Sequence, residues 1–342
     1  MDNFLMLLVS AFLLFEILYK AKLVKVNDGF FDAKNSLAMR GFWCLIVILV
    51  HVPAAYTNRI QDMIGSFAYI GVTFFFMTSS YGLTLSHDKD PDKIKKFWRK
   101  RLPKLLVVSL LINLSFAILN MIVFGDAITL KNLFTINGWV IWLIACYFAF
   151  WLSHLIFKQS YSAKILTVLL VIIGSIIMYT LNRNGIYKST IWATECFGFI
   201  WGILLASKRD VFTVFFLKKW QIKLLISCCI AGILGVSYLR FKPIPIAGDY
   251  LLKIILGLAI TLFVLVFNTR VALGNRINYF LGKISFEIYL VHLGVFHLFS
   301  RFDFWNSSSV FIISGMVATM IIAYLLNNVS GMILKQVNKV LV

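Results

Sequence analysis

The chain has 342 residues, of which 61% are hydrophobic and 14% are charged, and its formal net charge is +19. A soluble domain is about half apolar and about a quarter charged, so this composition excludes an ordinary soluble protein. Apolar stretches of roughly 17 to 25 residues recur from end to end. They indicate a single membrane-embedded unit without an extramembrane domain.

The apolar runs and the polar breaks between them predict an all-α polytopic bundle of about ten to eleven transmembrane helices. In chain order, the predicted helices cover residues 3–19, 38–56, 66–86, 104–124, 138–157, 164–181, 190–206, 222–239, 250–268, 280–299 and 310–333. The run 3–19 lacks an A-x-A-like cleavage site, so we expect a retained helix and not a signal peptide.

The basic residues are distributed unevenly among the predicted loops. If alternate loops share a side, one side holds 23 of the 33 Lys and Arg residues and the opposite loops hold seven; the basic side comprises segments 20–37, 87–104, 158–164, 207–223, 269–279 and 334–342. This asymmetry is the positive-inside signature, and it predicts a cell-membrane protein with the N-terminus outside and the C-terminus in the cytoplasm. We therefore expect membrane lipid, and no nucleic acid, as a partner.

The apolar segment SLAMRGFWCLIVILVHVPAAY, residues 36–56, contains two side chains that can carry a positive charge, Arg40 and His51. On one helix, residues eleven positions apart share a face and lie about 16 Å apart along the axis. We expect Arg40 at the cytoplasmic interface and His51 near mid-membrane. This spacing favours a ligand whose anionic end contacts the guanidinium and whose reactive end reaches the imidazole. The alternatives are a snorkelling anchor for Arg40 and a helix-to-helix hydrogen bond for His51.

The loop DKDPDKIKKFWRKRLPKLL, residues 88–106, leads directly into the next predicted helix. Three of its cations, Arg99, Arg101 and Lys104, stand at the membrane boundary. Such a cluster can bind a polyphosphate ligand, because Arg offers a planar bidentate fork and Lys a point charge. Attraction to anionic lipid head groups is the alternative.

Further polar residues in the predicted spans are candidates for substrate contacts, because polar groups are costly in lipid. They are Ser79, Ser80, Glu195, Tyr289 and His292. Glu195 either pairs with a cation inside the bundle or carries protons, whereas Glu287 fits structural polar packing. The five cysteines and five histidines are scattered without ligand spacing, so we expect neither a disulfide nor a metal site.

Four blocks of sequence, in order, resemble the membrane acyltransferase-3 family, the multi-pass O-acyltransferases of bacterial surface glycans. They are MRGFWCLIVILVH at 39–51, IGVTFFFMTSSYGL at 70–83, FWRKRLPKLL at 97–106 and LGKISFEIYLVH at 281–292. A fifth and weaker block is NGWVIWLIACY at 137–147. The resemblance covers essentially the whole chain from Arg40 onward.

The resemblance implies an acyl donor, usually acetyl-CoA, on the cytoplasmic side and a hydroxyl acceptor on a glycan or lipid-linked glycan at the outer face. It matches His51 to the family's catalytic histidine and Arg40 to its partner arginine. The family core usually has ten helices. Residues 1–35 are therefore expected to form an extra N-terminal helix and a basic cytoplasmic loop before an acyltransferase-3-like domain at 36–342.

The sequence departs from the family pattern at three positions. Arg101 and Lys104 stand where the family has two arginines, so the second position offers a simple charge in place of a bidentate contact. Thr73 stands where an acidic or small polar residue is common. Ser80 stands where glycine is usual, which raises the question of how closely the backbones approach there.

Together, the residues and the resemblance predict a membrane O-acyltransferase that moves an acyl group, expected to be acetyl, from acyl-CoA to a glycan hydroxyl. Direct transfer, with His51 as the general base, and an acyl-histidine intermediate both remain open. A transporter or flippase for an anionic glycolipid is the alternative, because it would also have many spans and a basic inner face. A structural or receptor-like protein leaves the spacing of Arg40 and His51 unexplained.

Overall fold

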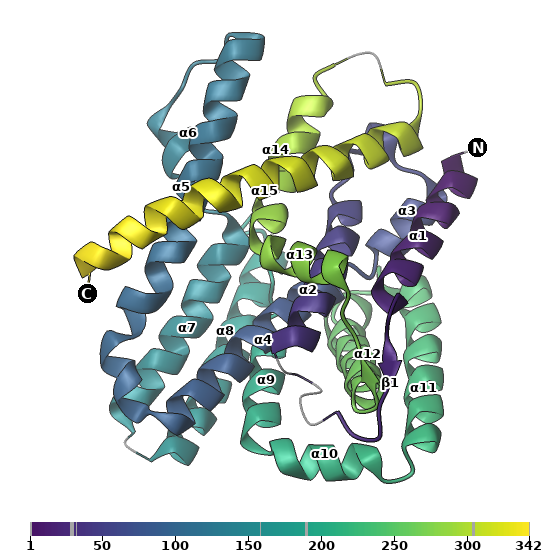
Figure 1. Ribbon diagram of the computed structural model, residues 1–342, viewed down its shortest axis with the longest axis vertical. Coiled ribbons are helices and arrows are strands. Elements are labelled where there is room, and N and C mark those ends of the chain that lie inside the picture. Colours follow the sequence, from purple (N-terminus) through teal and green to yellow (C-terminus); the bar gives the residue numbers. More distant parts are fainter. Residues whose placement is uncertain are drawn as a thin grey trace.

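The computed structural model describes residues 2–27, 31, 33–157, 159–188, 191–302 and 305–341 (Figure 1). Its α-helices are α1 (Asp2–Leu18), α2 (Ala33–Val50), α3 (Arg59–Gly65), α4 (Tyr69–Lys89), α5 (Phe97–Phe124), α6 (Leu130–Phe134), α7 (Gly138–Ile156), α8 (Ser160–Arg183), α9 (Phe197–Ser207), α10 (Arg209–Leu217), α11 (Trp220–Phe241), α12 (Lys253–Asn268), α13 (Arg276–Lys283), α14 (Ser285–Phe299) and α15 (Ser308–Leu341). Short 3-10 turns, η1 (Ala54–Tyr56) and η2 (Pro91–Lys96), and a π-helical turn, η3 (Ala247–Leu252), complete the helical elements.

The predicted all-α polytopic bundle is confirmed, and each predicted helix has a helical counterpart. Among the described helices, seven stretches are long and apolar enough to cross a membrane alone, and the bent pair α13–α14 makes an eighth if it forms one span. The helix predicted at 190–206 is shorter, because α9 has only 11 residues, and position 190 lies outside the described residues. The number of ten to eleven spans therefore stays a prediction.

The helix predicted at 280–299 is broken in the structure. The axes of α13 and α14 differ by 69°, and the break lies between Lys283 and Ser285. Gly282 approaches α2 so closely that a Cβ atom there would lie 2.0 Å from the Leu37 carbonyl oxygen. The bend thus lets α13 pack flat against α2 while α14 turns into the bundle.

Segments that the charge pattern assigns to one side of the membrane do meet in the structure. The strand β1 (Lys22–Leu23) pairs antiparallel with β2 (Val271–Ala272), which joins the segments 20–37 and 269–279. Asp88 and Lys164 form an ion pair of 2.7 Å, which joins the segments 87–104 and 158–164. These contacts fit the alternation of loops on which the predicted topology rests.

The first and last helices frame one face of the bundle. The Ser307 hydroxyl donates to an Asp2 carboxylate oxygen at 2.6 Å, and Asn278 Nδ2 donates to Glu16 Oε1 at 2.7 Å. Helix α15 runs obliquely across the other helices (Figure 1), and it packs on α14, α5 and α1. Helix α1 is therefore tied by polar contacts to elements near the other end of the chain.

Helix α4 is the most buried of the candidate spans, and it packs closely on α9. Two glycines of α9 make this possible: a Cβ on Gly198 would lie 2.1 Å from the Thr73 carbonyl oxygen, and one on Gly202 would lie 2.0 Å from Ser80 Oγ. The presence of Ser80 in place of glycine raised the question of how closely the helix backbones approach there, and α4 and α9 do approach closely. This approach is supplied by glycine on the partner helix, since small residues let helices approach in lipid.

Replacing Gly202 by Val is expected to destabilise the protein by about 1–3 kcal/mol or more, because the added atoms overlap Ser80 and the Met77 carbonyl oxygen. Thermal unfolding in detergent measures the effect. The matched control is Gly174→Val on α8, where nothing lies within 4 Å of the added Cβ. Equal melting temperatures for the two variants would contradict the packing argument.

Candidate active site

A cationic cavity lies among α2, α4, α5, α7 and α14. We call it the Arg40 pocket; its volume is about 310 Å³, and its polar wall consists of Ser36, Arg40, Thr78, Ser79, Arg101, Lys104 and Tyr147. The aromatic rings of Phe75, Trp139 and Phe286 complete much of the wall. The Arg40 guanidinium carbon lies 5.9 Å from the centroid of the Phe75 ring, and Lys104 Nζ lies 5.7 Å from that of Phe286.

The charge of the Arg40 pocket is one-sided. No acidic residue lines it among the residues described, and neither Arg40, Arg101 nor Lys104 has a carboxylate within 4 Å in that part of the chain. Arg40 Nε is buried and has no hydrogen-bond partner among the described atoms. Glu287 of α14 acts on Arg40 electrostatically but lies outside ion-pairing distance and does not line the pocket. A lining with three cations and no acid in the described chain raises the local concentration of anions, so this pocket suits an anionic ligand.

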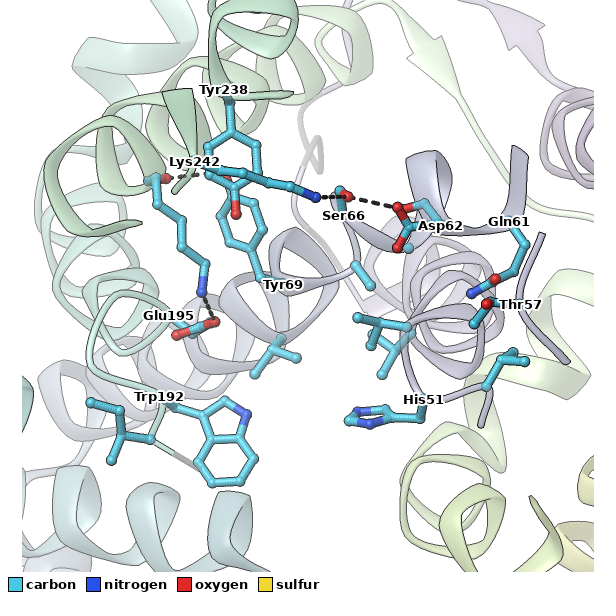
Figure 2. Close-up of a pocket in the computed structure, with 18 residues that line it drawn as sticks. His51, Thr57, Gln61, Asp62, Ser66, Tyr69, Trp192, Glu195, Tyr238 and Lys242 are labelled. Carbon is cyan, nitrogen blue, oxygen red and sulfur yellow. Dashed lines mark hydrogen bonds and ion pairs between the residues drawn. The ribbon is translucent and has the colours of Figure 1, made fainter. Parts of the chain in front are cut away.

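A second cavity contains His51, and we call it the His51 pocket (Figure 2). Its volume is about 370 Å³, and its lining includes His51, Gln61, Asp62, Tyr69, Trp192, Glu195, Tyr238, Lys242 and Lys253. The Trp192 indole and the His51 imidazole lie on facing sides of it (Figure 2). In contrast to the Arg40 pocket, it combines acids, cations, an amide and aromatic rings.

His51 lies directly beyond the end of α2, and not inside a helix as the sequence predicted for 38–56. Helix α2 ends at Val50, and the His51 backbone amide donates to the Ile48 carbonyl oxygen at 3.1 Å. Pro53 explains the early end, since the residue before a proline is disfavoured in the helical conformation. Arg40 and His51 consequently line two separate cavities. The two residues lie about 16 Å apart along the axis of α2.

Aromatic rings lie between the two pockets. Phe75 and Trp139 line the Arg40 pocket, and the Tyr289 ring contacts both, with centroid distances of 6.0 and 4.6 Å. Tyr289 in turn contacts His292 at 5.7 Å, and His292 contacts His51 at 4.9 Å. We call Phe75, Trp139 and Tyr289 the aromatic partition. Through it, Tyr289 and His292 connect the two pockets even though neither residue lines them.

Glu195 pairs with a cation, one of the two roles that its sequence left open. Its Oε1 atom lies 2.7 Å from Lys253 Nζ, and its Oε2 accepts a hydrogen bond from the Thr194 hydroxyl at 2.9 Å. The Glu195 side chain is 6% exposed and that of Lys253 is 20% exposed. The pair is therefore a partly desolvated element of the wall of the His51 pocket.

Lys253 directly follows a strained turn of the backbone. Ile246 has a left-handed φ of 64°, which is unusual for a β-branched residue, and η3 follows it. The Asp249 carboxylate holds this turn by accepting from the Ile246 amide at 2.7 Å and from the Tyr179 hydroxyl at 2.9 Å. Strained backbone and π-helical turns are common at functional sites, and here they start α12 with Lys253 facing Glu195.

Two further candidate residues from the sequence, Ser80 and Arg99, line neither pocket. Ser80 is fully buried between α4 and α9, and its hydroxyl donates to the Met77 carbonyl oxygen at 3.1 Å. Arg99 is exposed and lines neither pocket, whereas Ser79 lines the Arg40 pocket. Glu287 is buried, and neither of its carboxylate oxygens has a partner among the described residues.

Three residues of the His51 pocket were not predicted from the sequence: Asp62, Lys242 and Lys253. Lys253 had one signal, its position at the edge of an apolar run, but that position is also typical of an interfacial anchor. Asp62 and Lys242 lie in predicted loops, where charged residues are ordinary. Only the fold brings α3, α11 and α12 around His51.

The chain thus folds into a polytopic membrane helix bundle with a cationic cavity and a histidine-containing cavity near opposite ends of α2. A family model described as an acyltransferase domain, of the acyltransferase-3 family, matches residues 36–328. The chain belongs to this family and is a membrane acyltransferase. Comparisons with curated proteins and with solved structures gave no match.

Replacing Glu195 by Gln is expected to lower the free energy of unfolding by about 3 kcal/mol, because Lys253 keeps a partly buried charge without its partner. Chemical denaturation in detergent measures the loss. Adding Lys253→Met in the same chain should restore much of it.

The matched control is Asp92→Asn, which breaks an ion pair with 76% and 80% exposed side chains and should cost less than about 1 kcal/mol. A comparable loss in the two single variants would show that desolvation of the Glu195 pair has no consequence.

Proposed function

We propose that this acyltransferase moves an acyl group, expected to be acetyl, from acyl-CoA in the Arg40 pocket to a hydroxyl group of a surface glycan in the His51 pocket. The proposal rests on the different charged residues that line the two cavities. One is lined by three cations and no acid in the described chain, and the other combines a histidine with mixed polar groups. A polyanionic donor suits the first, and a sugar suits the second.

Arg40, Arg101 and Lys104 would hold phosphate groups of the donor at the mouth of the Arg40 pocket. The positive-inside pattern assigns this end to the cytoplasm, where acyl-CoA is available. Arg40 Nε is buried without a partner, so an anion there would satisfy a donor that the described protein atoms leave unpaired. Arg99 is exposed outside the pocket and would act only as a remote charge.

The acceptor would bind beside His51. A neutral imidazole removes the proton of the acceptor hydroxyl as its oxygen attacks the thioester carbonyl carbon, because imidazole is suited to proton transfer near neutral pH. The carbon–oxygen bond forms, the carbon–sulfur bond breaks, and the proton held by His51 passes to the leaving thiolate. The products are an ester and free CoA thiol, and His51 returns to its neutral form.

The aromatic partition places a requirement on this route. Phe75, Trp139 and Tyr289 form a set of ring contacts that extends from the Arg40 pocket toward His51, so these rings would move apart to let the thioester meet the acceptor. A small acyl group needs the smallest opening, which favours acetyl. The partition would also separate water at the His51 pocket from the donor until the acceptor is bound.

Replacing His51 by Ala is expected to reduce acyl transfer by at least about 100-fold while the protein still inserts in the membrane, because the general base is lost. Release of free thiol from acetyl-CoA by detergent-purified protein, with surface glycan extracted from the source cell, measures the effect.

His297→Ala is the control, since that residue is also a histidine near one end of a helix but lines neither pocket. Full activity of a well-folded His51→Ala protein would exclude His51 as the base. A wild-type protein inactive with several acyl-CoAs and with the appropriate glycan would favour the transporter alternative.

Replacing Arg101 by Gln is expected to raise the KM for acetyl-CoA about tenfold or more, because a charge-assisted hydrogen bond to a phosphate is lost. Steady-state kinetics at saturating acceptor gives the value. The matched control is Lys208→Gln, which removes an exposed cation on the same predicted side of the membrane. An equal rise in the KM for acetyl-CoA in both variants would mean that general surface charge, and not this pocket, attracts the donor.

A further inference from the structure

His292 is a buried histidine whose two ring nitrogens have different environments. It lies on α14 and is 1% exposed. Its Nδ1 atom lies 3.2 Å from the Ile288 carbonyl oxygen, one helical turn earlier. Its Nε2 atom is buried and has no hydrogen-bond partner among the described residues. One nitrogen is thus engaged by the helix backbone, and the other is left available.

The backbone contact determines the tautomer of His292. A carbonyl oxygen only accepts hydrogen bonds, so Nδ1 must carry the proton and donate it to Ile288. No carboxylate lies within 4 Å of the ring in the described part of the chain, and an unpaired imidazolium is costly in such a buried position. The neutral ring with an unprotonated Nε2 is the form that fits. Nε2 is then a hydrogen-bond acceptor.

The nearest imidazole to this acceptor is the proposed base. The ring centroids of His51 and His292 are 4.9 Å apart, and their planes are inclined by 43°. His51 lies in a turn beyond the last residue of α2, so a small rotation of its side chain can direct one N–H at His292 Nε2. We propose that His292 is a positioning residue that accepts a hydrogen bond from His51 and so fixes its tautomer and orientation.

This inference rests on the proposed function and adds a role to it. With one nitrogen of His51 donating to His292, the other nitrogen is unprotonated and faces the pocket, where it can take the acceptor proton. When His51 becomes an imidazolium, its hydrogen bond to Nε2 strengthens. His292 itself neither gains nor loses a proton. In hydrolases with a catalytic triad, a carboxylate orients the base in a comparable way.

A neutral partner suits the surroundings of His51. Glu195, the buried acid of the His51 pocket, is already bound to Lys253 at 2.7 Å, and Glu287 makes no contact within hydrogen-bonding distance of either imidazole among the described atoms. Asp62 also lines the pocket, but it has no ion pair with His51. His292 is therefore the group in place to orient the base.

The chain supplies a matched control for this arrangement. His154 on α7 is 7% exposed, its Nδ1 lies 2.7 Å from the Phe150 carbonyl oxygen, and its Nε2 is buried without a described partner. It also contacts a second histidine, His87, with ring centroids 4.2 Å apart. It lines neither the Arg40 pocket nor the His51 pocket. His154 thus reproduces the local structure of His292 without the base beside it.

The experiment compares His292→Gln, His292→Asn and His292→Phe with the same three changes at His154. The oxygen of the Gln amide can reach the place of Nε2, whereas the shorter Asn amide replaces only the Nδ1 end and Phe provides neither group. Thiol release from acetyl-CoA, with extracted surface glycan as the acceptor, gives kcat and KM for each variant. Thermal unfolding of each purified protein reports its folding.

We expect His292→Asn and His292→Phe to lower kcat about 100-fold with donor and acceptor KM values within about twofold of wild type. His292→Gln should keep kcat within about tenfold of wild type. The three His154 variants should lose thermal stability to a similar extent as their His292 counterparts but keep kcat. In a His51→Ala background, His292→Phe should cause no further loss, because its role acts through His51.

Equal kcat for His292→Gln and His292→Asn would overturn the positioning role, and this pair decides the matter even if the Phe variant fails to fold. Loss of activity that simply follows loss of thermal stability at both positions would overturn it as well. The proposed function fails separately: it is rejected if wild type releases no thiol, or if His51→Ala is fully active. An inactive wild type would overturn both proposals.

Discussion

Close packing around α4 is the constraint on which the arrangement of the site depends. Gly198 and Gly202 of α9 lie against the backbone and side chains of α4, and Gly71 lets α2 approach the same helix, since a Cβ there would lie 3.0 Å from Val47. Because α4 is held from two sides, its residues can serve both cavities. Phe75 lines the Arg40 pocket, and Val72, one turn earlier, lines the His51 pocket. Helix α4 therefore contributes to the lining of both cavities.

The two cavities differ in the charges of the residues that line them. The described lining of the Arg40 pocket has three cations and no acid, which favours an anionic ligand. The attraction between the pocket and this ligand weakens as salt screens it. In the His51 pocket, Lys253 is neutralised by Glu195, which leaves hydrogen-bonding groups and the Trp192 indole to select a ligand. The two cavities therefore suit ligands of different chemistry, one near each end of α2.

Three buried polar atoms without described partners lie in or beside the aromatic partition. Arg40 Nε, Trp139 Nε1 and His292 Nε2 are among those without a hydrogen bond in the described structure. An unpaired buried polar atom costs free energy, so each is a position where a ligand or a moving side chain can restore a hydrogen bond.

The class of fold, the approximate positions of the predicted helices and the prominence of Arg40 and His51 could all be predicted from the sequence. Those features follow from hydropathy and from the cost of charge in lipid, which are local properties. The end of α2 before His51 has a local cause in Pro53. The pairing of Lys253 with Glu195 and the contact of His292 with His51 depend on the tertiary structure. These contacts join residues 58 or more positions apart, and no local pattern encodes which face of one helix meets another.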